Sequence, residues 1–320
     1  MEEQKRLTQE EVTRAASQIG RVVDNVETVI IGKRQSVELV LLALLAKGHV
    51  LLEDVPGTGK TVLAKSLARS VHARFGRIQF TPDLMPSDVT GFSIYNQKTG
   101  EFEFRPGAVM SNLVLADEAN RASAKTQAAL LEAMEEKQVT VDSVTYPLEE
   151  PFMVMATQNP LESFGTYPLP EAQIDRFLIK LSMGYPSIEE ERRIIHGGAK
   201  AKTAISSVIS RREVLELQEL ADRVWVEPDV ERYIVEIVAA TRQNSRITLG
   251  SSPRGSIALN AAAKALALFR GRGYVIADDV KYLAPFVLGH RISLSHEART
   301  ERIEPNEMIR RIVEQVLAPI

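Results

Sequence analysis

Residues 51–61 read Leu-Leu-Glu-Asp-Val-Pro-Gly-Thr-Gly-Lys-Thr and have the residue types of a phosphate-binding loop. Gly57 and Gly59 let the main chain approach an anion without a Cβ in the way. Unpaired N–H groups in the first turn of a helix starting at Lys60 would point at that anion, and the helix dipole favours negative charge there. Lys60 would reach the β- and γ-phosphates, and the Thr61 hydroxyl would bind Mg²⁺. The segment predicts a nucleotide site with contacts from Asp54, Val55, Pro56, Gly57, Thr58, Gly59, Lys60, Thr61 and Val62.

One position departs from the loop pattern G-x-x-x-x-G-K-[ST], because Asp54 stands where the pattern has glycine. Aspartate is among the few non-glycine residues that tolerate a positive φ, so the turn can persist. We expect its carboxylate to point away from the phosphate, toward a backbone N–H group. The alternative is an ordinary strand–turn–helix junction with a surface lysine. The apolar run before the loop and the helical pattern after it disfavour that alternative.

Polar residues also follow two later strand-like runs. Asp117 and Glu118 come after the run 112–116, and Asn159 follows the run 152–157. Parallel sheets bind ligands at the carboxyl ends of their strands. There Asp117 would hold Mg²⁺ through water, Glu118 would orient or deprotonate the attacking water, and Asn159 could hold that water. Taken alone, Asn159 before proline is also typical of a plain turn.

Two arginines are candidates for stabilising phosphate charge. Arg176 ends a short predicted helix over 170–176, before another strand-like run at 178–183. Arg254 lies at the start of a later helix, where the helix dipole disfavours a cation. A cation at the disfavoured end is a hint that it serves an anion, although an exposed arginine near a helix start is the simpler interpretation.

Strand-like and helical runs alternate in the first part of the chain, which predicts a parallel sheet covered on both faces. An amphipathic helix is predicted over 8–28, followed by a short loop at 29–33 and a second helix to Lys47. Two β-hairpins, at 91–104 and 138–148, interrupt the alternation. The predicted strands are 50–53, 77–81, 112–116 and 152–157, and the predicted helices between them are 60–72, 122–137 and 170–176.

The character changes near Gly184-Tyr185-Pro186, where Ser187 and Glu190 have the spacing of a helix capping box. We therefore predict an α/β domain over residues 1–185 and a smaller all-α domain over 186–320. The predicted helices of the second domain are 188–200, 211–222, 228–243, 254–271, 277–290 and 304–317.

Composition narrows the class of protein. The 320 residues exceed what one hydrophobic core usually serves. The absence of cysteine excludes disulfides, thiolate metal sites and a cysteine nucleophile. We expect no signal peptide and no membrane span. A net charge of −3 does not show the excess of positive charge that is typical of nucleic-acid-binding proteins. Five scattered histidines lack metal-ligand spacing and are interpreted as structural: His49, His72, His196, His290 and His296.

In the order and spacing of its motifs, the chain resembles an AAA+ ATPase. These motifs are the loop, the Asp-Glu strand end, the strand-end Asn, the Asp-Arg-Phe at 175–177 and the later Arg. Within these motifs, the amino-acid sequence resembles that of the MoxR family, above all in the runs 51–61, 116–136, 156–160 and 169–177. The resemblance covers roughly residues 25–290. It implies an AAA+ P-loop parallel sheet with β-hairpin inserts and a helical lid domain.

The resemblance assigns roles to individual residues. It makes Lys60 and Thr61 the Walker A pair and Asp117 and Glu118 the Walker B pair. Asn159 becomes sensor 1, and Arg254 becomes sensor 2, which we expect at the γ-phosphate, so that nucleotide state would change the angle between the domains. It also matches Arg176 to the arginine finger, which acts on the neighbouring subunit's nucleotide, and Ile30, Ile31 and Gly32 to the segment that lines the adenine.

The resemblance also implies ATP and Mg²⁺ as cofactors and a cytoplasmic homo-oligomeric ring, a hexamer. It suggests a chaperone-like role with a von Willebrand factor A domain partner, which remodels, activates or metal-loads a client protein. Three alternatives stay open. They are a magnesium-chelatase-like motor subunit, a scaffold that binds ATP without turnover, and a nucleic-acid motor. The last is disfavoured because acidic residues accompany the basic ones in both hairpins.

Overall fold

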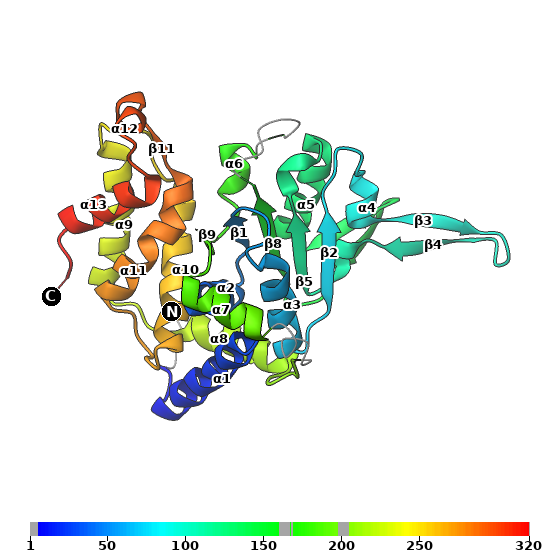
Figure 1. The fold of residues 1–320 in the computed structure, drawn as a ribbon, viewed down its shortest axis with the longest axis horizontal. Helices are drawn as coiled ribbons and strands as arrows, with labels where there is room; N and C mark the ends of the chain where they lie inside the picture. The colour runs from blue at the N-terminus through cyan, green and yellow to red at the C-terminus, as the bar shows by residue number, and fades with distance from the viewer. Residues whose placement is uncertain (1–5, 160–166, 168, 198–204, 320) are drawn as a thin grey trace.

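The structure is a computed structural model that describes residues 6–159, 167, 169–197 and 205–319. A five-stranded sheet lies at the centre of the first domain, with all neighbouring strands parallel and in the order β2-β5-β8-β1-β9. Figure 1 shows helices on both sides of this sheet. The alternation of strands and helices thus folds as predicted. The strands are β1 (Val50–Glu53), β2 (Phe75–Gln79), β5 (Leu113–Asp117), β8 (Met153–Gln158) and β9 (Ile179–Leu181).

Successive residues of each strand face opposite sides of the sheet, and both sides are buried. On one side, strand residues such as Val50 and Leu113 pack against three helices, two that precede β1 and one that follows it. On the other side, Leu51 and Val114 pack with residues of two later helices. The helices of the first side are α1 (Gln9–Glu27), α2 (Arg34–Leu45) and α3 (Lys60–Ser70), and those of the second are α4 (Pro86–Thr90) and α5 (Ala124–Glu136).

Both predicted hairpins are present as antiparallel pairs. β3 (Gly91–Asn96) pairs with β4 (Glu101–Pro106), and this hairpin extends away from the body of the domain in Figure 1. The second hairpin follows α5 directly. It pairs β6 (Gln138–Val141) with β7 (Val144–Pro147).

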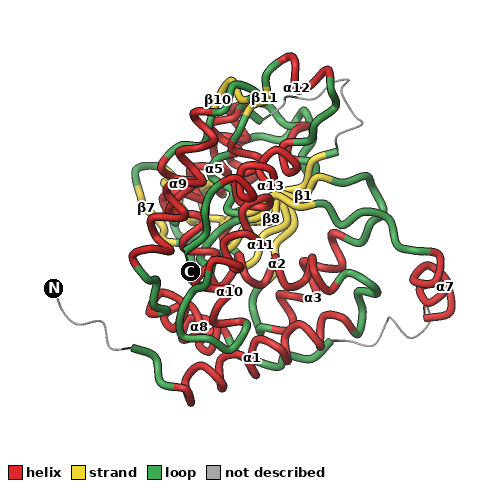
Figure 2. Tube along the Cα trace, turned by 90° about the vertical axis from the view of Figure 1, so that its left-hand side faces the viewer, coloured by secondary structure: helices red, strands yellow, loops and turns green. Residues whose placement is uncertain are grey.

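The second domain is mainly helical, and its first helix begins with the predicted capping box. Ser187 N donates to Glu190 Oε2 at 2.8 Å, and Glu190 N donates to Ser187 Oγ at 3.3 Å. Figure 2 shows the resulting helix α7 at the periphery of the molecule. Residues 198–200 of the predicted helix lie outside the described residues. The helices are α6 (Glu171–Ile174) before the junction, then α7 (Ile188–Gly197), α8 (Arg211–Arg223), α9 (Pro228–Gln243), α10 (Pro253–Phe269), α11 (Ala277–Leu288), α12 (His296–Thr300) and α13 (Pro305–Gln315).

The prediction of an all-α second domain was wrong in one respect. β10 (Ile247–Leu249) pairs antiparallel with β11 (Ser293–Leu294), and Thr248 Oγ1 donates to Ser293 O at 3.0 Å. Strands this short have no detectable period, and the two segments come together only when the helices between them fold.

The buried apolar residues of the second domain join the core on one side of the sheet. α10 contacts both α1 and α2, and α8 contacts α2. One cluster of buried side chains therefore runs from Ile19 and Leu41 to Leu259 and Leu283. The division near residue 186 stays a prediction. Within the described ranges, no helix combines the length and apolar character needed to cross a bilayer.

Candidate functional site

The loop between β1 and α3 has the backbone geometry of an anion cradle. Gly57 and Gly59 have φ of 88° and 94°, values that L side chains rarely adopt. A Cβ built on either glycine meets no described atom within 4 Å, so conformation rather than space requires glycine there. No described side chain caps the N-terminus of α3, and its first turn holds no acidic residue. Its first N–H groups are thus available to an anion.

Lys60 is held over the loop by main-chain carbonyl groups. Its Nζ donates to Asp54 O at 2.8 Å and to Val55 O at 3.2 Å. The Thr58 hydroxyl donates to the same Val55 carbonyl at 3.4 Å. A triphosphate in the cradle would offer this ammonium group charged oxygens in place of neutral carbonyls, which makes stronger hydrogen bonds.

The carboxylate of Asp54 points away from the cradle, as expected from the sequence. Oδ1 accepts from Ser182 Oγ at 2.9 Å and from Gly184 N at 3.1 Å, while Oδ2 accepts from Met183 N. Asp54 is only 5% exposed. A nucleotide contact by the main chain of Asp54 stays a prediction. The side chain instead ties the loop to the segment that follows β9.

A pocket of about 420 Å³ lies at the carboxyl edge of the sheet beside this loop. It brings together the residues that the sequence predicts from three separate strand ends. Lys60 and Thr61 follow β1, Asp117 ends β5 and Glu118 follows it, and Asn159 follows β8. The full lining is Pro56, Gly57, Gly59, Lys60, Thr61, Val62, Arg77, Gln79, Asp117, Glu118, Thr157 and Asn159.

The Asp117 carboxylate is held by neighbouring strands on both sides of β5. Thr157 Oγ1 donates to Oδ1 at 2.7 Å, and the Arg77 guanidinium donates to Oδ2 at 2.7 Å. The Asp117 side chain is 14% exposed, whereas that of Arg77 is 47% exposed. Asp117 and the Thr61 hydroxyl thus supply two hard oxygen ligands in one pocket, a donor set that suits Mg²⁺ shared with phosphate oxygens.

Glu118 adopts a left-handed backbone conformation, with φ 56° and ψ 47°. Such a conformation costs a non-glycine residue of order 1 kcal/mol and is often found at functional sites. Its N–H donates to Thr157 Oγ1 at 2.8 Å, which fixes the turn. Its Oε2 accepts from Gln79 Nε2 and from Arg121 Nε, each at 3.0 Å. The carboxylate is thereby held in the lining of this pocket, which is called the phosphate pocket below because it borders the loop.

Sequence reasoning missed three residues of this pocket, namely Arg77, Gln79 and Thr157. Arg77 and Gln79 lie on β2, where Gln79 is in register with Asp117. The alternation Arg77-Ile78-Gln79 was a usable signal, since it places two polar side chains on one face of a strand. Their partners could not be predicted, because they depend on β2 lying next to β5.

The segment expected to line the adenine lies outside the phosphate pocket. Ile30 is buried in the core at 6% exposure, and Ile31 is half-buried. Gly32 has φ 74°, and a Cβ there would collide with the Glu190 side chain of α7. The adenine contacts of this segment stay a prediction.

Arg176 and Arg254 lie together at the opposite edge of the sheet. They line a second pocket, of about 380 Å³, with Lys47 to His49, which lead into β1, and with Leu178, which leads into β9. Both guanidinium groups pair with Glu135 of α5, Arg254 at 3.1 Å. Of the described residues, none lines both pockets. β1 alone separates the two edges by roughly 13 Å, at about 3.3 Å per residue.

This placement corrects the expectation that Arg254 reaches the γ-phosphate of its own chain. Arg254 is the second residue of α10, and α10 packs on α2 and α8. The helix therefore presents its N-terminus to the amino edge of the sheet, beside Arg176. The loop at the carboxyl edge lies beyond its reach.

His49 has the structural role that the sequence indicates. Its Nδ1 accepts from Val154 N at 3.0 Å, and its Nε2 donates to Met134 O at 3.2 Å. Burial is the main cause that lowers the pKa of His49 to about 4. The ring is therefore neutral at pH 7, and it fastens the start of β1 to β8 and α5.

Two family models match the chain. The model described as "ATPase family associated with various cellular activities (AAA)" matches residues 49–179, and the one described as "AAA lid domain" matches residues 239–312. Among curated relatives, the Mycobacterium tuberculosis protein named Chaperone MoxR1 is 46% identical over 308 residues, which cover 93% of this chain and 82% of the relative. The Paracoccus denitrificans protein named MoxR is 30% identical over 305 residues, covering 87% and 89%.

The chain belongs to the MoxR family of AAA+ ATPases. The uncharacterized protein YeaC of Bacillus subtilis (strain 168) is 56% identical over 304 residues, or 94% of this chain and 95% of that protein. A crystal structure of a presumed ATPase from Cytophaga hutchinsonii superposes with a TM-score of 0.91 at 42% identity, covering 97% and 98% of the two chains. The α/β fold with a helical lid is thus shared over 97% of this MoxR-family chain.

Proposed function

We propose that this MoxR-family protein hydrolyses ATP in a ring of identical subunits whose active sites lie between neighbours. One subunit would supply the P-loop, Glu118 and Asn159, and the next would supply Arg176 and Arg254. One observation carries this proposal. The phosphate pocket and the arginine pair occupy opposite edges of one sheet, so a single chain cannot bring both to the same nucleotide. A head-to-tail ring places one edge against the other.

The residues of the phosphate pocket account for the binding half of this reaction. The N–H groups of the loop and α3 would bind the phosphates, with Lys60 at the β- and γ-phosphates. Thr61 and Asp117 would hold Mg²⁺, which neutralises charge on the phosphates when it is bound. Glu118 would accept a proton from the attacking water or orient it, and Asn159 would hold that water. Phosphoryl transfer then depends mainly on positioning and on charge stabilisation.

The arginine pair would supply the rest of the charge stabilisation from the next subunit. Glu135 holds both guanidinium groups within the chain, with Arg176 also donating to Leu131 O at 3.0 Å. Their exposed fractions, 29% for Arg176 and 55% for Arg254, leave both accessible to a neighbour's γ-phosphate. A phosphate with more than one negative charge would compete with the single carboxylate of Glu135 for these cations.

Mixed assemblies test this arrangement. Arg176→Ala and Arg254→Ala should each lower kcat, by roughly 10³-fold for a residue that acts as an arginine finger. Either variant, mixed with an inactive Lys60→Ala partner that keeps both arginines, should regain activity. With random 1:1 mixing, about a quarter of the interfaces would join a working loop to a working arginine pair.

The control is Arg212→Ala, which removes an 88% exposed arginine that pairs with Glu216 on its own helix. It should leave turnover unchanged. If the Arg254→Ala variant gains no activity in the mixture while Arg176→Ala does, Arg254 does not act across the interface. If neither variant is rescued, the shared active site is refuted.

We also infer that the protein has a chaperone-like role in the cytoplasm, where it forms a hexamer. Its partner would be a von Willebrand factor A domain protein, and together they would remodel, activate or load with metal a client protein. The name of the 46% identical relative, Chaperone MoxR1, supports the chaperone-like part. A Glu118→Gln form loaded with ATP should hold partner and client together. Capture with this form, compared with capture by Lys60→Ala, tests the idea, and equal recovery from both would refute it.

A further inference from the structure

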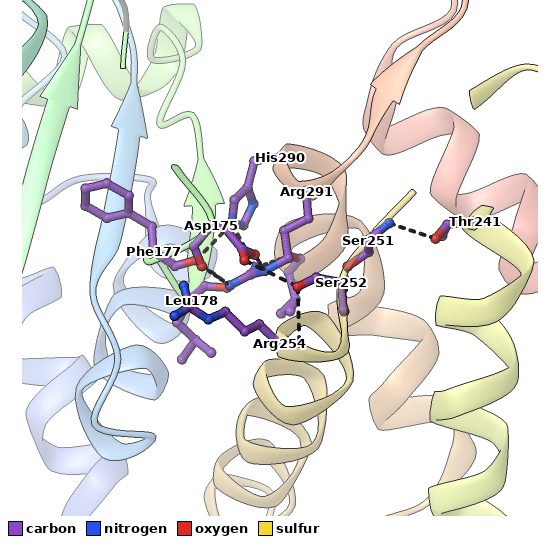
Figure 3. A network of polar contacts seen from close by, with 10 residues as sticks. Asp175, Phe177, Leu178, Thr241, Ser251, Ser252, Arg254, His290 and Arg291 are labelled. Atoms are coloured by element: carbon purple, nitrogen blue, oxygen red, sulfur yellow. Dashed lines mark hydrogen bonds and ion pairs between the residues drawn. The ribbon is translucent and has the colours of Figure 1, made fainter. Parts of the chain in front are cut away.

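Arg291 of the lid is buried against the segment that carries Arg176. It ends the short turn η3 (Gly289–Arg291) that follows α11, and its side chain is 3% exposed. Its partner Asp175, in the first domain, immediately precedes Arg176. Figure 3 shows the Arg291 side chain directed at the segment from Asp175 to Leu178, with the start of α10 beside it.

The guanidinium group of Arg291 binds this segment at several points. Nε donates to Asp175 Oδ1 at 2.8 Å, one terminal nitrogen donates to Asp175 O at 3.1 Å and Phe177 O at 2.7 Å, and the other donates to Leu178 O at 3.2 Å and to Val287 O. Val287 lies on α11, and the other acceptors lie on both sides of Arg176 in the sequence. A planar, forked donor matches such a set of acceptors, whereas a lysine ammonium does not.

The burial of this charge is costly, which makes a purely stabilising role a poor explanation. A buried ion pair is often no more stabilising than well-packed apolar residues of the same volume. Burial lowers the pKa of Arg291 to about 10, against the opposing effect of Asp175, so the guanidinium stays charged at pH 7. What the arrangement provides is a fixed geometry for the backbone around Arg176.

The same carboxylate connects this segment to Arg254. Asp175 Oδ2 accepts from Ser252 Oγ at 3.4 Å, and Ser252 caps α10 by accepting from Arg254 N at 3.2 Å. The side chains of Arg176 and Arg254 then meet at Glu135. The two arginine-bearing segments, one from each domain, are thus joined through Asp175 and held by Arg291.

We propose that Arg291 is a positioning residue that clamps residues 175–178 to the lid, so that Arg176 and Arg254 are presented to the neighbouring subunit's nucleotide as one unit. This inference rests on the proposed function, in which the arginines act across the interface. Arg291 itself does not touch the nucleotide. It acts by setting where the two guanidinium groups stand.

Arg291→Lys keeps the charge but loses the fork. A misplacement of about 1 Å at a catalytic group can lower kcat roughly 10²-fold, and we expect a loss of 10- to 100-fold here. The KM for ATP should change little, because the substitution leaves the loop and the other residues of the phosphate pocket unchanged. Ser252→Ala removes the hydroxyl that links Asp175 to the start of α10 and caps that helix, and it should give a smaller loss of the same kind.

Arg272→Lys is the matched control. Arg272 also forms a double ion pair within the lid, donating to Asp279 at 2.6 Å and 2.8 Å, and Asp279 is fully buried. Its partner lies on α11 rather than on the segment that bears Arg176. Thermal unfolding should show comparable destabilisation for Arg272→Lys and Arg291→Lys, with kcat falling only in the latter.

Mixed assemblies decide whether Arg291 acts through the arginines. Arg291→Lys mixed with Lys60→Ala should regain activity, because the Lys60→Ala subunit presents correctly placed arginines to the intact loop of its neighbour. The parallel mixture of Arg176→Ala with Lys60→Ala reports on the proposed function itself. Rescue of Arg176→Ala without rescue of Arg291→Lys overturns the positioning role alone. Wild-type kcat in both Arg291→Lys and Ser252→Ala overturns it as well.

Discussion

Replacing Asp54 with asparagine distinguishes two uses of a carboxylate at this position of the P-loop. If the carboxylate faced the phosphates, removing its charge would strengthen nucleotide binding. In the structure it faces the other way and accepts three hydrogen bonds, from Ser182, Met183 and Gly184. The substitution should therefore loosen the loop and weaken nucleotide binding.

The size of the effect follows from the bonds that are lost. A hydrogen bond to a charged group contributes about 1.5–3 kcal/mol, and a neutral one contributes about 1 kcal/mol. Asparagine would make neutral bonds and would turn an N–H donor toward at least one of the three donors. We expect a loss of about 3 kcal/mol in the free energy of unfolding, or about 1 M in the urea midpoint for a slope near 3 kcal/mol/M.

Two measurements test this reasoning. Urea unfolding followed by circular dichroism gives the stability, and calorimetric titration with Mg²⁺-ADP gives the affinity, which we expect to fall roughly tenfold. Asp222→Asn is the control, since Asp222 is 62% exposed and pairs with Lys47, a contact worth under about 1 kcal/mol. Tighter nucleotide binding by Asp54→Asn at unchanged stability would refute the orientation of this side chain.

Three further predictions follow from single contacts. Gly57→Ala should weaken Mg²⁺-ADP binding in calorimetry, because the φ of 88° at this position costs alanine about 1–2 kcal/mol. The control Gly20→Ala, in the middle of α1, should instead raise the midpoint of thermal unfolding. Normal nucleotide binding by Gly57→Ala would contradict the argument. Arg77→Met should lower the Mg²⁺ concentration for half-maximal ATPase activity by about two- to fivefold, since it removes a competing ion pair, and a higher requirement would show that Arg77 assists the site instead. Burial lowers the pKa of His49 to about 4 in the native state, so between pH 6.5 and 4 the unfolded chain takes up a proton there that the native chain does not. The free energy of unfolding should therefore fall by up to about 3 kcal/mol as the pH is lowered from 6.5 to 4. His49→Gln should flatten this slope in urea unfolding while exposed His296→Gln leaves it, and an unchanged slope in His49→Gln would contradict the argument.

The elements of the fold were predictable because their signals are local. The helix over 228–243 and the hairpin around Gly100 follow from period and turn chemistry within a short window. The pair β10–β11 was missed because its strands have two and three residues, too few for a period, and pair across an intervening stretch of helices.

Part of the candidate site was predictable for the same reason. Lys60, Asp117 and Asn159 each follow a recognisable apolar strand, and parallel strands bring their carboxyl ends to one edge. The partners of Asp117 and Glu118 on β2 were missed. These partners depend on which strand lies beside β5, and only the strand order β2-β5-β8-β1-β9 shows that it is β2.

By itself, then, the sequence determined a loop with the P-loop pattern, the acidic and amide residues that lie beside it, and a helical region after residue 186. Only the tertiary structure decided that Arg176 and Arg254 lie together at the far edge of the sheet, held by Glu135 and by Arg291. The physical reason is that loop and helix signals arise from neighbours along the chain. The edge that a lid arginine reaches depends on how α10 packs against α1 and α2, more than 200 residues away in the sequence.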